Sequence, residues 1–298
     1  MTIPGAAASV LLIAALGVGC GDNISDSSSG FVGNPQDLKA FSVNESAVRL
    51  QWSRPAGTPD SVLGSYQISF LGRDDTVPKA TPFYVASSLP AGETQFTVYA
   101  RTINGRRGDG TSLQWAPAAR FDSALVLQEF KTTDLGVNCC LDVGSAFQDP
   151  SILSFSSPNA RLYVDLFVWG EGTSVGQASS PLELRSASLF TSAYNATLFS
   201  PVTHTATSLD YPLGEFPQEF SLTSIAVQDN TIYYVRVLGE NGAVFFARVY
   251  VKVLGGTAPN RTIAVRISLQ RIPALPIAAQ MISHPSPLAA AIPVFGPR

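Results

Sequence analysis

Few residues of this sequence could act as nucleophiles, bases or metal ligands, because its 298 residues include only three cysteines and two histidines. Cys139 and Cys140 are adjacent, so their Cα atoms lie about 3.8 Å apart, below the usual range for a disulfide. A bond between them would be strained and easily reduced, so one interpretation is a redox pair. The other, and commoner, role for such residues is that of small buried side chains in a strand or turn.

No pattern of residues indicates a catalytic centre. His204 is the one histidine outside the C-terminal tail, and no Gly-x-Ser-x-Gly sequence accompanies a serine. Clustered zinc ligands and an EF-hand loop are also missing from the sequence. A glycoside hydrolase needs two paired carboxylates. The second half offers several carboxylates, none marked as a pair: Asp134, Asp142, Asp149, Asp165 and Glu171. We predict a non-enzymatic protein without metal or cofactor, and keep a carbohydrate-active enzyme as an alternative.

Cys20 closes an apolar run at the N-terminus. Residues 9–18 are almost all apolar, are too few to span a bilayer and end in small residues that suit a signal peptidase. This segment resembles a bacterial lipoprotein signal, whose cysteine takes a diacylglycerol and becomes the new N-terminus. The resemblance implies a signal peptide over residues 1–20, lipidation of Cys20 and attachment to the cell envelope; Gly21 after the cysteine favours the outer membrane. The alternative is an ordinary secretory signal.

The composition favours a sheet-rich exported protein. Hydrophobic residues make up 45% of the chain and charged residues 14%, while 24 glycines and 21 prolines supply turns. The net charge is −3 and no basic block occurs, so nucleic acid is not an expected partner. After residue 20 no apolar run is long enough to span a membrane. Residues 21–33 are rich in Ser, Gly and Asp and predict a flexible tether.

Residues 34–122 show short alternating runs separated by turn signals, which predict an antiparallel sandwich. The clearest runs are Ala47–Trp52, Ser65–Phe70 and Phe96–Arg101. The spacing of apolar residues and turns resembles a fibronectin type III domain. The residues that carry this resemblance are Pro35, Leu38, Val48, Leu50, Trp52, Pro55, Tyr66, Ile68, the run Leu89–Phe96, Asn104, Gly108 and Ser112. Phe96 stands where the family usually has its corner tyrosine, so the hydrogen bond of that hydroxyl is absent.

Arg107, Gly108 and Asp109 follow the third run, in the expected loop. In animal fibronectin the same tripeptide in this loop binds integrins, which makes adhesion one interpretation. A tripeptide also arises by chance in a chain of this length, and the domain already requires Gly108. We therefore expect coincidence.

Residues 123–272 predict a second β-sandwich-like domain. Arg161–Trp169 reads as one long strand. Thr231–Leu238 and Ala243–Val253 flank an Asn-Gly turn and predict a hairpin, and Thr262–Leu269 reads as a last strand. The hairpin and the ending Gln270-Arg271-Ile272-Pro273 faintly resemble β-rich lipoproteins that carry haem outside bacterial cells.

That resemblance implies a haem-like ligand, and haem needs an axial ligand. The residues that could ligate haem are Tyr163, Tyr233, Tyr234 and His204, although tyrosine in a strand more often packs than ligates. The last 26 residues, 273–298, are rich in Pro and Ala and predict an extended or disordered tail. The expected function is that of a lipid-anchored envelope module that binds or spaces a protein or glycan. A small-molecule carrier remains an alternative.

Overall fold

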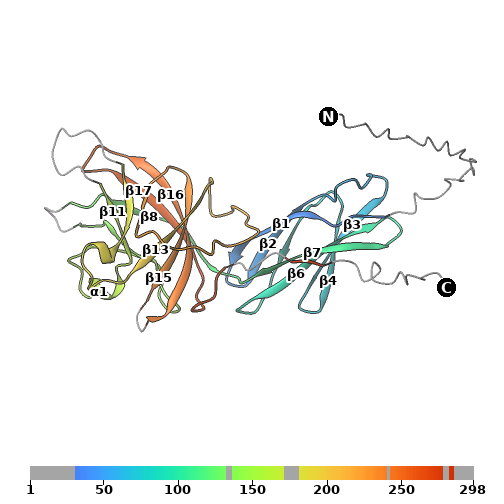
Figure 1. Ribbon diagram of the computed structural model, residues 1–298, viewed down its shortest axis with the longest axis horizontal. Helices are drawn as coiled ribbons and strands as arrows, with labels where there is room; N and C mark the ends of the chain where they lie inside the picture. Colours follow the sequence, from blue (N-terminus) through green and yellow to red (C-terminus); the bar gives the residue numbers. More distant parts are fainter. Residues whose placement is uncertain (1–30, 132–135, 171–180, 240–241, 278–281, 285–298) are drawn as a thin grey trace, which may run out of the picture. The chain divides into compact units, whose positions relative to one another are not determined.

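The computed structural model describes residues 31–131, 136–170, 181–239, 242–277 and 282–284. Nearly all regular structure in these ranges is β-strand, and the strands form two successive sandwiches (Figure 1). The prediction of an all-β fold with two successive sandwiches is confirmed. Within the described residues, no helix is long and apolar enough to cross a membrane.

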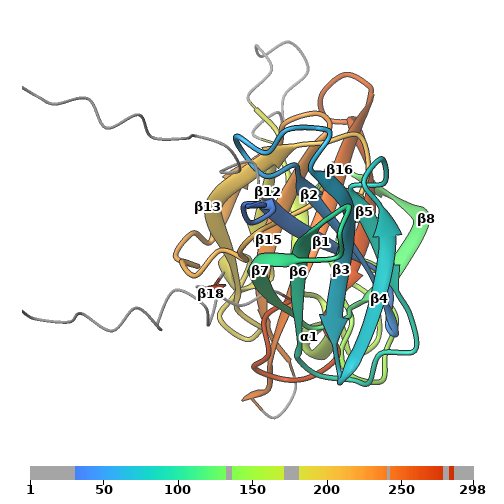
Figure 2. The same ribbon diagram turned by 90° about the vertical axis from the view of Figure 1, so that its right-hand side faces the viewer.

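The first sandwich pairs a three-stranded sheet with a larger one. Its sheets have the orders β1-β2-β5 and β18-β7-β6-β3-β4, and all neighbours are antiparallel (Figure 2). The strands are β1 (Gln36–Asn44), β2 (Ala47–Ser53), β3 (Leu63–Phe70), β4 (Arg73–Pro78), β5 (Phe83–Ala86), β6 (Thr94–Thr102), β7 (Arg107–Trp115) and β18 (Ile282–His284).

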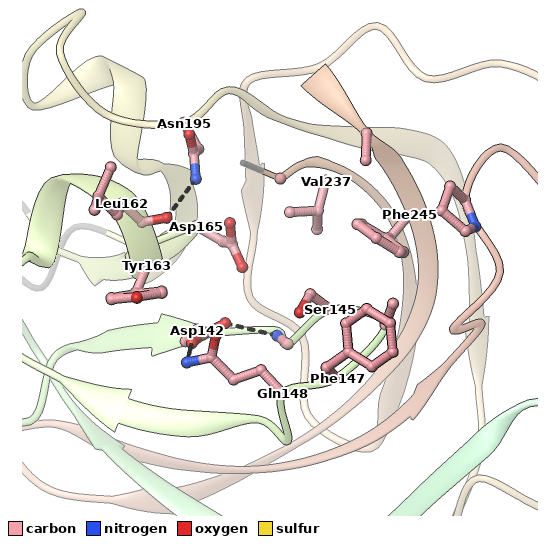
Figure 3. A pocket seen from close by; sticks show the side chains of 15 residues that line it. Asp142, Ser145, Phe147, Gln148, Leu162, Tyr163, Asp165, Asn195, Val237 and Phe245 are labelled. Carbon is pink, nitrogen blue, oxygen red and sulfur yellow. Dashed lines mark hydrogen bonds between the residues drawn. The ribbon is translucent and has the colours of Figure 1, made fainter. Parts of the chain in front are cut away.

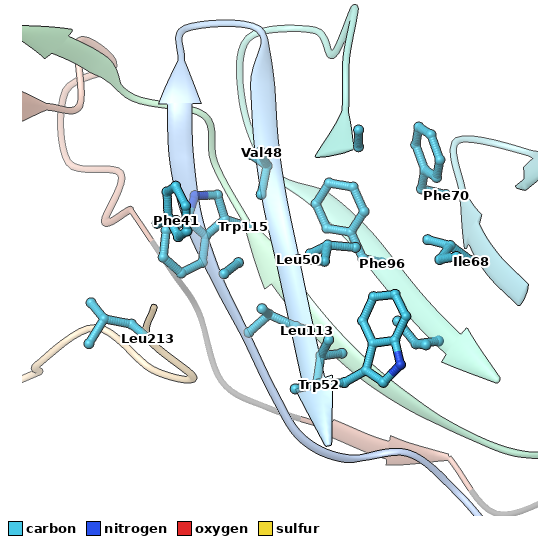
Figure 4. Packing of buried hydrophobic residues seen from close by; sticks show 14 of the residues in the cluster. Phe41, Val48, Leu50, Trp52, Ile68, Phe70, Phe96, Leu113, Trp115 and Leu213 are labelled. Atoms are coloured by element: carbon cyan, nitrogen blue, oxygen red, sulfur yellow. The ribbon is translucent and has the colours of Figure 1, made fainter. Parts of the chain in front are cut away.

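Alternation of side chains creates the core of the first sandwich. In β2, Val48, Leu50 and Trp52 point inward, whereas Gln51 and Ser53 between and beyond them are exposed. Phe96 of β6 is fully buried in the same cluster, so its ring fills the core without a hydroxyl (Figure 4). The period-2 pattern in the sequence therefore translated directly into burial.

The second sandwich contains two five-stranded sheets, with orders β10-β9-β11-β12-β14 and β13-β15-β16-β17-β8. Its elements are β8 (Ala119–Gln128), β9 (Cys140–Asp142), β10 (Ser151–Leu153), α1 (Ala160–Tyr163), β11 (Leu166–Trp169), β12 (Glu183–Ser186), the 3-10 turn η1 (Ala187–Leu189), β13 (Thr197–Thr205), β14 (Ser224–Ala226), β15 (Thr231–Leu238), β16 (Val244–Gly255) and β17 (Thr262–Leu269). β15 and β16 pair from Thr231↔Val251 to Leu238↔Val244, as the hairpin prediction requires.

The prediction of one long strand over Arg161–Trp169 is wrong. The segment divides into α1 and β11, which are separated by Val164 and Asp165. Asn159 precedes the helical turn in the left-handed region, with φ of 59°. The Asp165 side chain accepts a hydrogen bond from the Val143 backbone, which fixes the break between helix and strand.

Contacts along the chain join the two sandwiches. The Ala40 and Leu213 backbones exchange two hydrogen bonds of 2.8 Å, and Leu213 and Phe216 belong to the same buried cluster as the first core. Ser42 Oγ accepts hydrogen bonds from Trp115 Nε1 and the Ala118 backbone, both at 3.0 Å. β8 begins at Ala119, before the boundary at 122 that the sequence suggested.

Both ends of the described chain contact the first sandwich. Val32 is 2% exposed and the Gly33 backbone donates to Thr58 Oγ1, although the sequence places both residues in the tether. In the tail, Ile277 is buried and accepts a hydrogen bond from the Ala116 backbone, and β18 pairs with β7. The prediction of an extended or disordered tail from residue 273 stays a prediction for residues 278–281 and 285–298, which lie outside the described residues. The edge of β7 is thus paired by β18, a strand that the Pro-rich composition of the tail did not predict.

Candidate functional site

A pocket of about 270 Å³ opens in the second sandwich, where β9 ends and β11 begins (Figure 3). β9 and β11 are antiparallel, with Leu141 opposite Leu166. One further step in that register places Asp142 opposite Asp165, and both line the pocket. Asp142 is 4% exposed and Asp165 is 3% exposed. The sheet thus brings together two acids that lie far apart in the sequence.

Backbone and amide donors hold Asp142 in place. Its Oδ1 accepts from the Gly144 backbone at 2.7 Å, and its Oδ2 accepts from Gln148 Nε2 at 2.8 Å. Gly144 has a positive φ of 95°, and a Cβ there would meet the Gln148 carbonyl oxygen at 2.6 Å. The turn that supplies these donors therefore requires glycine.

Asp165 is held by fewer side-chain contacts. Its Oδ2 accepts from the Val143 backbone at 2.8 Å, and its carboxylate points into the pocket (Figure 3). Its backbone carbonyl also accepts from Thr197 Oγ1 at 2.8 Å. Burial raises the pKa of Asp165 well above its ordinary value, and the charge of Asp142 raises it further. The site therefore combines two adjacent carboxylates with unequal environments.

Aromatic and amide groups complete the walls. Tyr163 comes from the end of α1, Phe245 from β16 and Phe147 from the loop after β9. Phe147 is 100% exposed, which is uncommon for a large apolar side chain. Asn195 lies across the pocket and donates to the Leu162 carbonyl at 2.8 Å. The arrangement can accept hydrogen bonds from a polar ligand while aromatic rings cover its apolar faces.

The sequence named five carboxylates but no pair. Asp134 and Glu171 lie outside the described residues, and exposed Asp149 forms an ion pair with Arg271 at 2.5 Å. Asp142 and Asp165 are the two that the fold brings together. A usable signal was present, since Asp142 lies between Leu141 and Val143 and Asp165 between Val164 and Leu166. An acid inside an apolar run predicts a buried carboxyl group that must be hydrogen-bonded or paired, because burying a charge is costly.

Cys139 and Cys140 are free thiols in this structure. Both are fully buried, with Sγ atoms 3.1 Å apart, in a cluster with Phe130 and Phe167. Burial raises the pKa of the Cys140 thiol, which keeps it protonated near neutral pH. Their role as a redox pair stays a prediction.

The tripeptide Arg107–Asp109 does not lie in a loop. Arg107 is the first residue of β7, and its guanidinium lies 4.2 Å from the Tyr99 ring centroid. A Cβ at Gly108 would lie 2.2 Å from the Val32 carbonyl oxygen. The expected loop position is therefore wrong, because the strand begins earlier and Gly108 packs against the N-terminal segment.

Of the four candidate haem ligands, His204 and Tyr234 lie side by side, whereas Tyr163 and Tyr233 lie elsewhere. Tyr233 and Tyr234 are neighbours in β15, so their side chains point to opposite faces of the sheet. Tyr233 donates to the Ala226 carbonyl and accepts from the Gln228 backbone, and Tyr234 Oη lies 2.9 Å from His204 Nδ1. Tyr163 alone of the four lines the acidic pocket.

Cys20, the signal segment and residues 21–30 of the tether lie outside the described residues. Within the part of the chain that is described, no group of three or more His, Cys, Asp or Glu side chains is placed to hold a metal ion.

No family model and no curated protein sequence matches this chain. Among solved structures, the FN5 domain of Drosophila Lar is 22% identical, covering 29% of this chain and 96% of that domain, with a TM-score of 0.24. A two-domain fibronectin type III segment of chicken tenascin is 13% identical, covering 84% of this chain and 99% of that one, with a TM-score of 0.25. A family 28 exopolygalacturonase of Yersinia enterocolitica is 19% identical over 38% of this chain and 23% of the enzyme, with a TM-score of 0.25.

Proposed function

We propose that this protein is an exported envelope module that binds a glycan, and that the pocket between Asp142 and Asp165 receives one sugar residue. The observation that carries the proposal is the placement of two buried carboxylates in one cavity. An ionised carboxylate accepts hydrogen bonds and a protonated carboxyl group also donates one, so the pair suits a ligand rich in hydroxyl groups, which do both. Lipidation of Cys20 would hold the module at the membrane.

The walls and the size of the pocket limit which ligands fit. Small-molecule sites usually measure about 300–1,000 Å³, and this pocket, at about 270 Å³, lies just below that range. It therefore suits a single ring rather than a long chain laid across the surface. Exposed Phe147 at the rim offers an aromatic face to the apolar side of such a ring.

The test is titration of the purified protein with a panel of monosaccharides and short glycans, followed by calorimetry. We expect Asp165→Asn and Phe147→Ala each to weaken binding of the best ligand at least tenfold. The control is Tyr99→Phe, a tyrosine of β6 outside the pocket, which should bind like the wild type. The proposal is wrong if no glycan binds, or if Asp165→Asn binds the best ligand as tightly as the wild type does.

A second function, glycoside hydrolysis, is favoured by the unequal environments of the two acids. Hydrolysis needs one protonated and one ionised carboxyl group, and neighbouring acids in different surroundings can supply them. The raised pKa of Asp165 suits the acid, leaving Asp142 as base or nucleophile. Release of 4-nitrophenol from nitrophenyl glycosides, lost in both Asp165→Asn and Asp142→Asn, would establish an enzyme. Glycan binding without turnover would leave a binding module.

A further inference from the structure

A second hollow, of about 470 Å³, lies on the opposite face of the β15–β16 hairpin. The acidic pocket is lined by Val237 and Phe245, whereas this groove is lined by their neighbours Arg236, Val244 and Phe246. Because successive side chains of a strand alternate between faces, the two hollows are separated by the sheet itself. We call the second hollow the Arg236 groove.

Aromatic packing forms the apolar part of the groove. Phe246 is the cross-strand partner of Arg236, and its ring centroid lies 5.5 Å from that of Phe220. Phe216 packs edge-on against Phe246 at 5.9 Å and is fully buried, which fixes the Phe246 ring. Pro217 and Pro276 also line the groove and add rigid apolar surface.

Arg236 is the one charged residue among the described residues that line this groove. Its side chain is exposed and makes neither an ion pair nor a hydrogen bond with the described part of the chain. Gln218, the other polar lining residue, donates its amide to the Phe216 carbonyl at 2.9 Å. Among the described residues, the groove thus presents a single unpaired cation at the edge of an apolar surface.

A second arginine adds positive potential to this face. Arg248, two residues after Phe246 on β16, is 1% exposed and donates to the Tyr211 carbonyl. Burial lowers its pKa to about 10, so the guanidinium remains charged at neutral pH. Asp210 of the neighbouring segment pairs with Arg120 at 2.6 Å, and its charge also acts on Arg248.

We infer that the Arg236 groove binds an amphiphilic monoanion, a carboxylate joined to an apolar chain. The guanidinium would take the carboxylate through a charge-assisted, bidentate contact. Phe220, Phe246 and Val244 would cover the chain, and a volume of about 470 Å³ lies within the usual range for small-molecule sites. This inference is independent of the glycan proposal, because the two sites share no lining residue.

The test is calorimetric titration of the purified protein with sodium decanoate below its micelle concentration. We expect saturable binding that Arg236→Gln weakens at least tenfold. Val244→Asp, which places an acid in the groove, should abolish it. Sodium acetate, which lacks the chain, and decanol, which lacks the charge, should each bind at least tenfold more weakly than decanoate.

Two controls make the outcome decisive. Arg106→Gln removes an exposed arginine of the first sandwich and should leave decanoate binding unchanged, as should Asp165→Asn in the acidic pocket. Failure of the wild type to bind decanoate overturns the inference. So does wild-type binding by Arg236→Gln, or an equal loss in Arg106→Gln. Because Arg236 is exposed, its variant should melt like the wild type, which separates lost binding from lost folding.

Discussion

At the scale of single residues, the buried acid Asp165 has the largest consequence. It sits in the sandwich with its carboxylate facing both the pocket and Asp142, so its ionisation is opposed by burial and by a like charge. A carboxyl group whose pKa is raised in the folded state binds its proton more tightly there than in the unfolded chain. Its contribution to stability is complete below the unfolded pKa of about 4 and is lost as the pH rises.

We therefore expect Asp165→Asn, which keeps an acceptor for the Val143 backbone without the charge, to gain stability relative to the wild type between about pH 4 and 7. Each unit by which the pKa is raised corresponds to about 1.4 kcal/mol. Thermal unfolding followed by circular dichroism across this pH range measures the difference. The exposed Asp37→Asn serves as control and should track the wild type. A constant offset between Asp165→Asn and the wild type at every pH would contradict the assignment.

Residue identity alone could have indicated these acids but not their partnership. Asp142 and Asp165 stand out in the sequence because each interrupts an apolar run. Their pairing depends on the register of β9 against β11, and the sequence predicted a single strand where α1 and β11 form. The same limit applies to Arg236. From the alternating pattern alone, it is a residue on the polar face of a strand. The groove beside it depends on Phe220, from a distant segment, packing against Phe246.

At the scale of elements, glycines determine how closely strands and segments approach. Gly108 of β7 lies against the Val32 backbone, where a Cβ would come within 2.2 Å of a carbonyl oxygen. We expect Gly108→Ala to displace residues 31–33 and to lower the unfolding free energy by about 1–3 kcal/mol, as overpacking does. Chemical denaturation measures the loss.

Gly33→Ala is the matched control, because its added Cβ would meet its nearest neighbour at an ordinary 3.6 Å. It should change stability by less than about 0.5 kcal/mol. Equal effects of the two substitutions would show that the tight contact at Gly108 does not exist in solution.

A buried ion pair links Glu129, directly after β8, to Arg261, directly before β17, in the second sandwich. The Glu129 side chain is 0% exposed and accepts from Arg261 Nη2 at 2.7 Å. Arg261→Met leaves that carboxylate buried without its cation, so we expect a loss of about 3–5 kcal/mol by denaturant unfolding. Arg54→Met, which breaks an exposed pair with Asp60, should cost less than about 1 kcal/mol. Comparable losses of unfolding free energy in Arg261→Met and Arg54→Met would contradict the expectation that the buried ion pair matters more than the exposed one.

Strand elements were the most predictable level of this protein. The alternating runs of the first sandwich, the hairpin β15–β16 and β17 lie where the period-2 pattern and the Asn-Gly turn indicate. The misplaced element is the run Arg161–Trp169, where a buried polar side chain outweighed β-propensity. The position of Arg107–Asp109 was misjudged because the end of a turn depends on contacts with Val32, which the local pattern does not reveal.

At the scale of the whole molecule, one hydrophobic cluster contains residues of both sandwiches. Leu213 is 5% exposed in this cluster, and its backbone bonds to Ala40. We expect the two sandwiches to unfold together. Leu213→Ala should lower the stability of both by about 2–5 kcal/mol.

Single-tryptophan variants separate the two signals, because Trp115 reports on the first sandwich and Trp169 on the second. Coincident denaturation midpoints for the two probes, shifted equally by Leu213→Ala, are the expected result. Two midpoints, with only one shifted, would mean that each sandwich unfolds independently.

The alternation of side chains between the two faces of β15 and β16 has a genetic consequence. A substitution on either strand reaches only one hollow, so the acidic pocket and the Arg236 groove can change separately. One residue inserted before Val235 would shift the phase of the strand, turning Arg236 toward the Val237 side and Val235 toward the groove. Deep mutational scanning scored by the amount of folded protein should therefore find β15 tolerant of many exchanges at position 236 and intolerant of every single-codon insertion.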